Sequence, residues 1–248
     1  MRLKDKVVIV TGGASGIGKA TALLFAAEGA RVVVADLDRT QGMETVDAIE
    51  AAGGEARFVR VDISVEADAA ALSAAVERDF GRLDVLVNCA GIFLAPRVRV
   101  DLFEAKAWER VIDVNLKGIF LTTKHAVQPM ERSGGGVILF IASTAGVTSS
   151  SASVAYGASK GGVHGLAFTL AEQLEPANIR VNVVCPNDIS TPLKLEAIRE
   201  IAEREGQDPE EALEAWQSAL GEPEGVARVL ALLASDDAAY VRGTVFTR

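Results

Sequence analysis

The sequence is poor in the residues that build metal sites and disulfide frameworks. It has two cysteines and two histidines in 248 residues. Cys89 and Cys185 lie in or beside apolar runs, and their number and spacing match neither a disulfide framework nor a metal site. His125 and His164 lie far apart in the sequence, and we expect both to be ordinary helix or surface residues. The sequence therefore predicts no metal site.

Long apolar runs and an excess of basic residues are also missing. No apolar run approaches the ~20 residues that span a bilayer. The run Val7–Val10 is shorter than the ~7–15-residue core of a signal peptide. The net charge of −9 disfavours nucleic acids and anionic membrane surfaces as partners. We expect a cytoplasmic protein that acts on a small molecule.

What the chain has is a regular alternation of short Val/Ile-rich runs with longer helical patterns. Hydrophobic residues make up 49% of the sequence, enough for a large core. Strands are predicted at Val7–Val10, Arg31–Ala35, Arg57–Val61, Val85–Asn88, Val137–Ile141, Arg180–Cys185 and Thr244–Phe246, with helices such as Ile17–Glu28, Thr40–Ala52 and Ala67–Phe80 between them. Continuously apolar strands that alternate with helices indicate an α/β fold in one domain: a doubly wound, seven-stranded parallel sheet with helices on both faces.

One segment, residues 187–222, interrupts this alternation. It is charged and helix-prone, and it lies between the sixth and seventh predicted strands, where insertions often form lids over ligand crevices. Its apolar residues are spaced as in amphipathic helices: Leu193, Leu195, Ile198, Ile201, Leu213 and Trp216. Two interpretations stay open, because these side chains suit either an apolar substrate or packing on the core.

A glycine-rich turn joins the first predicted strand to the first helix. Glycines stand at 12, 16 and 18, so the backbone can turn sharply and approach a ligand closely. The helix that follows would offer free N–H groups and its positive dipole end to a pyrophosphate. A purely structural turn is the alternative.

The second predicted strand ends at Asp36, which favours NAD as the ligand of this turn. A carboxylate 18 residues after Gly18 can accept hydrogen bonds from the adenosine ribose hydroxyls and would repel the additional phosphate of NADP. Arg39 argues for NADP, since a nearby arginine can hold that phosphate. The two negative charges of Asp36 and Asp38 outweigh this argument, so NAD is still favoured. The alternative is a solvated aspartate at a strand end.

Tyr156 and Lys160 lie four residues apart in a helical stretch and therefore share a helix face. An ammonium beside a phenol favours the phenolate, so we expect Lys160 to lower the pKa of Tyr156 toward the working pH of a general base. Ser143 follows the fifth predicted strand, at the sheet edge where ligands bind, and can hold a substrate oxygen. Ser149 to Ser151 are expected in a loop beside the substrate.

These motifs resemble those of the short-chain dehydrogenase/reductase family, and the resemblance runs from Lys6 to about Thr247. It implies a Rossmann-type fold and a catalytic set of Asn115, Ser143, Tyr156 and Lys160. It also implies cofactor contacts from Gly12, Ser15, Gly16, Ile17, Gly18, Asp36, Asp62, Ile63, Asn88, Ala90, Gly91, Tyr156, Lys160, Pro186, Ile189 and Thr191.

The activity that the resemblance implies is NAD-dependent hydride transfer between the nicotinamide and a secondary alcohol or ketone. Tyr156 would be the general acid/base, Lys160 would hold the nicotinamide ribose, and Ser143 would position the substrate oxygen. Asn115 falls on the apolar stripe of its predicted helix, where a buried amide needs hydrogen-bond partners. It is either internally satisfied or, as in the family, part of a water-linked relay from Lys160 to solvent.

The resemblance also implies a homotetramer or homodimer, assembled mainly through the long helices around Asn115 and Tyr156. The sequence departs from the family at Cys89, where a second asparagine is usual, and at Asn187, where glycine is usual. Asparagine tolerates the left-handed backbone conformation better than most other residues, so we expect the turn at Asn187 to survive. Relatives continue into an Asp-Gly-Gly segment, whereas this sequence ends at Thr247-Arg248, which leaves open a truncated chain or a different assembly.

Two other functions stay open on the same scaffold. One is a non-redox enzyme, such as a lyase or epimerase, and the other is a regulatory nucleotide-binding protein.

Overall fold

Seven parallel strands form the centre of the molecule. The computed structural model describes residues 1–247. Arg248, named above at the end of the sequence, lies outside the described residues. The strands are β1 (Val7–Thr11), β2 (Arg31–Asp36), β3 (Glu55–Arg60), β4 (Val85–Asn88), β5 (Gly136–Ile141), β6 (Ile179–Pro186) and β7 (Gly243–Thr247). Their order in the sheet is β3-β2-β1-β4-β5-β6-β7. The predicted doubly wound parallel sheet is confirmed.

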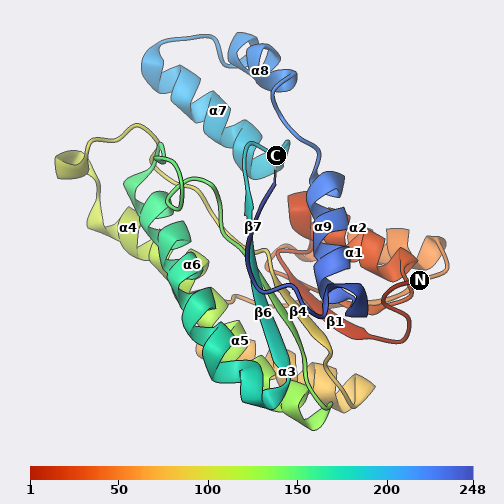
Figure 1. Cartoon of the computed structure of the whole chain (residues 1–248). Helices are drawn as coiled ribbons and strands as arrows, with labels where there is room; N and C mark the ends of the chain where they lie inside the picture. The colour runs from red at the N-terminus through yellow and green to blue at the C-terminus, as the bar shows by residue number, and fades with distance from the viewer. Residues whose placement is uncertain (248) are drawn as a thin grey trace.

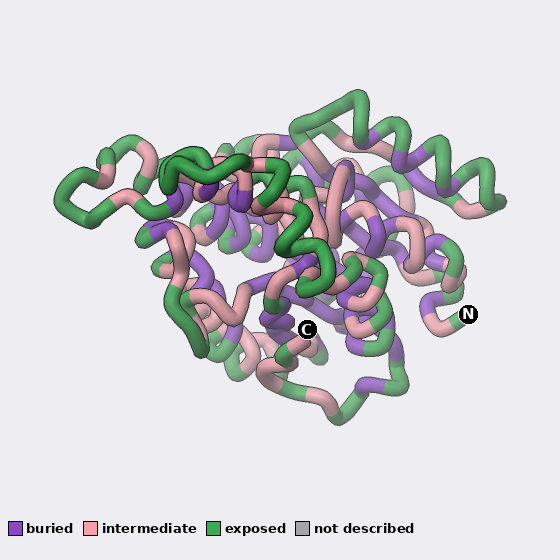
Figure 2. The backbone as a smooth tube through the Cα atoms, turned by 90° about the horizontal axis from the view of Figure 1, so that it is seen from above, coloured by how far each residue is buried: buried purple, intermediate pink, exposed green. Residues whose placement is uncertain are grey.

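Helices cover both faces of this sheet (Figure 1). They are α1 (Gly16–Ala27), α2 (Arg39–Ala51), α3 (Glu66–Phe80), α4 (Ala105–Ile112), α5 (Ile119–Arg132), α6 (Val154–Leu174), α7 (Pro192–Glu205), α8 (Pro209–Gln217) and α9 (Pro223–Ala234). One core layer joins the sheet to α1, α2 and α9, and the other joins it to α3, α5 and α6. Figure 2 shows buried segments concentrated in the middle of the molecule and exposed ones at its periphery.

The predicted strands match the observed ones because both faces of most strands are buried. In β1, for example, all five residues are buried, which is why the sequence shows an unbroken apolar run. The exception is β3, predicted at Arg57–Val61 but observed at Glu55–Arg60. It is an edge strand, and pairing with β2 from Arg31↔Glu55 to Asp36↔Arg60 decides where it begins, whereas its hydrophobic pattern alternates and marks the ends poorly.

The strand order reverses between β1 and β4, which lie side by side although β2 and β3 separate them in sequence. In sheets of this kind the helices diverge at such a point and leave a crevice at the carboxyl ends of the strands. Segment 187–222 stands at this end of the sheet. It contains α7 and α8, which project beyond the sheet edge, whereas α9 returns to pack against α1 (Figure 1).

Within residues 1–247, no helix combines the length and the apolarity that crossing a membrane requires.

Candidate active site

The turn after β1 can be built only with glycine at its key positions. Gly12 and Gly16 have φ of +67° and +52°, in the left-handed region. A Cβ on Gly18 would lie 2.0 Å from the carbonyl oxygen of Gly12, and one on Gly12 would lie 2.8 Å from the backbone nitrogen of Ala90. The turns after β1 and β4 therefore touch, and the backbone of the first is open to a close ligand.

Helix α1 begins in this turn without a side-chain cap. Ser15 is the residue before the helix, and its hydroxyl makes no capping hydrogen bond. The first N–H groups of α1 thus lack the usual internal acceptor, as a phosphate-binding helix terminus requires.

Asp36 lies at the end of β2, beside the glycine turn. Its carboxylate accepts hydrogen bonds of 3.0 Å from the backbone N–H groups of Ala14 and Asp38. Asp36 therefore fixes the turn as well as facing the crevice. Asp38 instead caps α2 by accepting from the N–H of Gln41 at 3.0 Å, and Arg39 is exposed at the start of that helix.

Asp62 follows β3 and is held in its ionised form. Burial by itself would raise the pKa of Asp62, but hydrogen bonds from Ser64 and the positive charge of Arg110 outweigh it and lower the pKa. The backbone N–H and the hydroxyl of Ser64 both donate to its carboxylate, at 2.9 and 2.6 Å. The next residue, Ile63, is buried against Gly118, where any Cβ would be 2.7 Å from its side chain.

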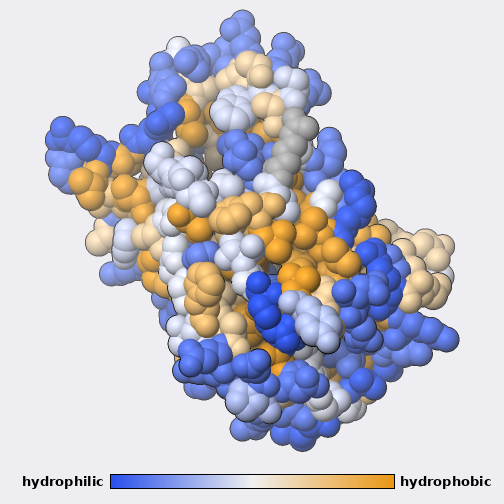
Figure 3. Space-filling view, viewed as in Figure 1, coloured by the Kyte–Doolittle hydropathy of each residue, from blue (hydrophilic) through white to orange (hydrophobic). Residues whose placement is uncertain are grey.

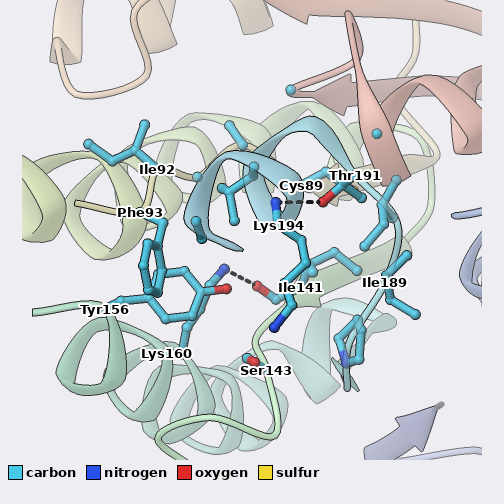
Figure 4. A pocket seen from close by; sticks show the side chains of 18 of the residues that line it. Cys89, Ile92, Phe93, Ile141, Ser143, Tyr156, Lys160, Ile189, Thr191 and Lys194 are labelled. Atoms are coloured by element: carbon cyan, nitrogen blue, oxygen red, sulfur yellow. Dashed lines mark hydrogen bonds between the residues drawn. The ribbon is translucent and has the colours of Figure 1, made fainter. Parts of the chain in front are cut away.

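Three of the four predicted catalytic side chains meet at the carboxyl end of β5. Ser143 stands just after that strand, and Tyr156 and Lys160 project from the first turns of α6, as Figure 4 shows. The Tyr156 ring packs edge-on against Phe93, with the ring centroids 4.9 Å apart. Lys160 is buried, and its Nζ donates a 2.8 Å hydrogen bond to the backbone carbonyl oxygen of Ile141.

The electrostatics of this group correct one expectation. Burial raises the pKa of Tyr156 to about 12, against a smaller lowering effect of a hydrogen bond with Ser143. Burial also lowers the pKa of Lys160 to about 8. The expected lowering of the Tyr156 pKa by Lys160 is wrong for this structure, because the ammonium lies 5.5 Å from the ring centroid and desolvation dominates both groups.

Asn115 lies in a π-helical segment, Asp113–Gly118, that joins α4 to α5. Its Oδ1 accepts from the N–H of Ile92 at 2.8 Å, and its Nδ2 donates to the carbonyl oxygen of Ile92 at 2.9 Å and to Ser159 Oγ at 3.1 Å. Ser159 Oγ in turn donates to the carbonyl oxygen of Tyr156 at 2.7 Å. The fully buried amide is thus internally satisfied, and it ties the loop after β4 to the backbone of Tyr156.

Asn88 is also buried away from the crevice. Its Oδ1 accepts from Thr122 Oγ1 at 2.7 Å, and its Nδ2 donates to Thr123 Oγ1 at 3.2 Å. It therefore joins the end of β4 to α5, as a sheet-stabilising residue does, and does not face the space where a cofactor would lie.

The turn after β6 corrects the expectation about Asn187. Its φ is not positive, so the position does not use the left-handed conformation for which glycine or asparagine would be needed. Asn187 Oδ1 accepts from Thr144 Oγ1 at 3.1 Å, and its N–H donates to the carbonyl oxygen of Thr247 at 3.2 Å. Further on, Thr191 caps α7 and approaches the glycine turn, 3.2 Å from where a Cβ of Gly16 would be.

One cavity of about 480 Å³ joins the glycine turn to the catalytic group. The predicted site residues that line it are Gly12, Ser15, Gly16, Ile17, Gly18, Asp36, Asp62, Ile63, Ala90, Gly91, Ser143, Tyr156, Lys160, Pro186, Ile189 and Thr191. Ser149 to Ser151 line it too. Asn88 and Asn115 are the predicted site residues that do not.

Sequence reasoning missed several further side chains that line this cavity, among them Leu37, Phe93, Arg110 and Lys194. The sequence could have indicated Leu37 and Phe93, because Leu37 directly follows Asp36 at the end of β2 and Phe93 lies two residues after Gly91 in the loop after β4. Arg110 and Lys194 come from helices whose orientation the sequence alone does not determine.

The cavity suits a dinucleotide on the evidence of its own residues. A turn that excludes a Cβ at Gly12 and Gly18, an uncapped helix start and a strand-end carboxylate follow one another along one side, and the candidate catalytic group closes the other. These residues would hold the pyrophosphate, the adenosine ribose and the nicotinamide end respectively.

Comparison with known proteins agrees with this geometry. Residues 6–201 match the family model described as short chain dehydrogenase. An uncharacterized oxidoreductase of Thermotoga maritima is 36% identical over 250 residues, covering 99% of this chain and 96% of the relative. The 3-oxoacyl-acyl-carrier-protein reductase FabG of the same organism is 38% identical over 251 residues, with coverage of 99% and 96%.

The crystal structure of levodione reductase superposes with a TM-score of 0.91 at 32% identity, covering 99% of this chain and 96% of that one. The chain belongs to the short-chain dehydrogenase/reductase family. Membership supports a dehydrogenase or reductase role with a nicotinamide cofactor and a small-molecule substrate.

Proposed function

We propose that this protein is an NAD-dependent oxidoreductase that interconverts a secondary alcohol and a ketone, with Tyr156 as the general acid/base. The observation that carries the proposal is the shared cavity, in which Ser143, Tyr156 and Lys160 lie opposite the glycine turn and Asp36. The relatives named above as reductases, FabG of Thermotoga maritima and levodione reductase, support carbonyl chemistry.

The preference for NAD rests on Asp36. Its carboxylate borders the cavity, whereas Arg39, the nearby residue that could hold an additional phosphate, is exposed and does not border it. A 2′-phosphate at this position would meet a negative charge without a cation facing it from α2. Asp36 instead has lone pairs left to accept hydrogen bonds from ribose hydroxyls.

Bound NAD would supply the hydride acceptor for alcohol oxidation, and its reduced form the hydride donor for ketone reduction. Tyr156 Oη exchanges the proton with the substrate oxygen, and the Ser143 hydroxyl holds that oxygen in place. With the pKa of Tyr156 raised to about 12, the phenol is protonated at neutral pH and stands ready as the acid of ketone reduction. Lys160 holds the ribose and supplies positive charge beside the phenol.

Asn115 supports this group as a positioning residue. Its amide fixes Ile92 and, through Ser159, the backbone of Tyr156. A methyl group on Gly91 would lie 3.4 Å from Asn115 Oδ1 and 3.6 Å from Lys160 Nζ, so the two side chains approach the same point of the loop. The water-linked relay from Lys160 past Asn115 stays a prediction.

A single domain would carry both cofactor and catalysis, with residues 187–222 as its substrate lid. Leu193 and Ile201 of α7 line the cavity, whereas Ile198 is buried beneath the helix. The apolar side chains of this lid would therefore have two roles. Leu193 and Ile201 would contact the substrate, and Ile198 packs on the core. The lid would keep water from the reacting carbon.

The protein would act as a homotetramer or homodimer in the cytoplasm. Trp108 on α4, Phe120 on α5 and Phe168 on α6 are 41%, 45% and 54% exposed, as expected of helices that pair with a second copy. Figure 3 shows a second apolar area over β7 and α9, where Leu232 and Phe246 are exposed. Light scattering after gel filtration measures the assembly directly.

The test is to follow nicotinamide absorbance with purified protein, NADH and a broad panel of ketones, and in parallel with NAD and the matching alcohols. Turnover with NADH that exceeds turnover with NADPH supports the proposal. Cofactor binding without any change in absorbance across the panel would favour a regulatory nucleotide-binding protein, and product formation without net redox change would favour a lyase or epimerase.

A further inference from the structure

A second cavity adjoins the catalytic one, between the loop after β4 and helix α7. Its volume is about 280 Å³. Its walls are Gly91, Ile92, Phe93 and Leu94 on one side and Leu193, Glu196, Ala197 and Glu200 on the other. Five of these residues also border the catalytic cavity, so the two spaces lie side by side along the same loop and helix. The tail of a ketone held at Tyr156 would pass the shared residues Phe93 and Leu193 to reach the second cavity.

The part of the second cavity nearest the catalytic group is apolar. Phe93 borders both cavities, and its ring packs edge-on against Tyr156. Ile92 and Leu94 flank it in the loop, and Leu193 faces them from α7. A hydrocarbon tail attached to the carbonyl group would be removed from water and buried against these side chains, which favours binding.

The far part of the cavity is acidic. Glu196 and Glu200 are four residues apart on α7 and so share one helix face. Among the residues that line this cavity, none is basic. Arg204 lies 2.9 Å from the carboxylate of Glu200, but the nearest guanidinium nitrogen to Glu196 is that of Arg199, at 4.0 Å. Glu196 is therefore the less compensated of the two charges.

Lys194 and Arg110, two basic side chains of the catalytic cavity, do not offset this acidity. Lys194 is paired with Asp188 at 2.5 Å, and its ammonium also lies 4.4 Å from the centroid of the Trp216 ring. Arg110 lies near Asp62, after β3. An anionic substrate group would therefore find no uncommitted cation on α7 and would meet the two carboxylates.

We propose that Glu196 and Glu200 are specificity-determining residues that admit ketones whose apolar tail ends in a neutral or cationic group and disfavour those with an anionic tail. The inference rests on the proposed function, because it assumes that the carbonyl group lies at Tyr156. It concerns the tail alone and is independent of the direction of the reaction.

The test compares three ketones of matched length: 2-octanone, 8-amino-2-octanone and 7-oxo-octanoate. Their dissociation constants are measured by calorimetry on the protein saturated with NAD⁺, which has no hydride to give to a ketone. We expect the ammonium ketone to bind at least about fivefold more tightly than the carboxylate ketone, since each partly exposed charge pair contributes roughly two- to fivefold. Raising NaCl to about 1 M should reduce this ratio by screening.

Glu196→Gln should lower the ratio of the two affinities by roughly two- to fivefold. Glu203→Gln is the matched control, since Glu203 lies on the same helix, is exposed and borders neither cavity. A wild-type ratio near one, tighter binding of 7-oxo-octanoate, or an equal effect of Glu203→Gln would overturn the inference, and so would a failure of all three ketones to bind.

Turnover of the same ketones with NADH separates this inference from the proposed function. Charge-selective binding without reduction of any ketone would contradict the proposed function and leave the binding result in support of the inference. Reduction of all three with equal efficiency, together with equal affinities, would support the function and overturn the inference.

Discussion

Lys160 Nζ is hydrogen-bonded to the carbonyl oxygen of Ile141 at 2.8 Å and does not contact the hydroxyl of Tyr156, although the two residues share one face of α6. The buried ammonium is thus held by the last residue of β5. In this arrangement Lys160 can influence Tyr156 only through the electrostatic field of its ammonium, which lies 5.5 Å from the centroid of the Tyr156 ring.

The buried ammonium of Lys160 should make the free energy of unfolding depend on pH. Burial lowers the pKa of Lys160 from 10.5 to about 8, so between these values the unfolded chain binds more protons than the folded one. The free energy of unfolding of the wild type should therefore rise, relative to Lys160→Met, as the pH increases from about 8 to 10.5. Denaturant titrations at several pH values in this window measure the difference, and a flat or falling difference would contradict the burial of a titrating ammonium.

The second prediction concerns cofactor choice. Asp36→Asn removes the negative charge that faces the cavity, so the ratio of kcat/KM with NAD to kcat/KM with NADP should fall by about tenfold or more. Asp38→Asn is the control, because Asp38 lies two residues away but caps α2, which asparagine also does well. If the control shifts the ratio as far as Asp36→Asn, the discrimination does not reside in Asp36.

The third prediction concerns the glycine turn. A Cβ on Gly18 would lie 2.0 Å from the Gly12 carbonyl oxygen, so Gly18→Ala should distort the turn and weaken NAD binding by at least about tenfold. Gly165→Ala places the same methyl group on α6, where nothing of the same chain lies within 4 Å, and should leave NAD binding unchanged. Calorimetry of NAD binding and thermal unfolding of both variants check the pair. Equal effects would mean that the turn tolerates a side chain.

Much of the fold could be predicted from the sequence because most strands are buried on both faces. The runs that contain Val8, Val32 and Val85 are nearly pure Val, Ile, Leu and Ala, and only the edge strand β3 was displaced. The candidate catalytic cluster was predictable for a similar reason, since the carboxyl ends of parallel strands meet at one edge of the sheet. Ser143 and Asp36 follow such strands, and the structure brings them to one cavity.

Two properties could not be predicted from the sequence: the direction in which long side chains point, and the shift in pKa that burial causes. Spacing on a helix places Tyr156 beside Lys160, but it does not show that the ammonium bonds to Ile141. The pKa of Tyr156 then depends on desolvation, which is a property of the whole packed site. Asn187 likewise depends on the neighbouring segment, since Thr144 and Thr247 hold its turn without a left-handed residue.

The most direct test of the central claim is the rate of NADH oxidation by a ketone in the wild type and in Tyr156→Phe. The variant keeps the ring that packs against Phe93 but has no proton to donate, so NADH should bind as before while kcat falls by about 10²- to 10⁴-fold. If Tyr156→Phe reduces the ketone as fast as the wild type, Tyr156 is not the general acid and the proposed mechanism is wrong.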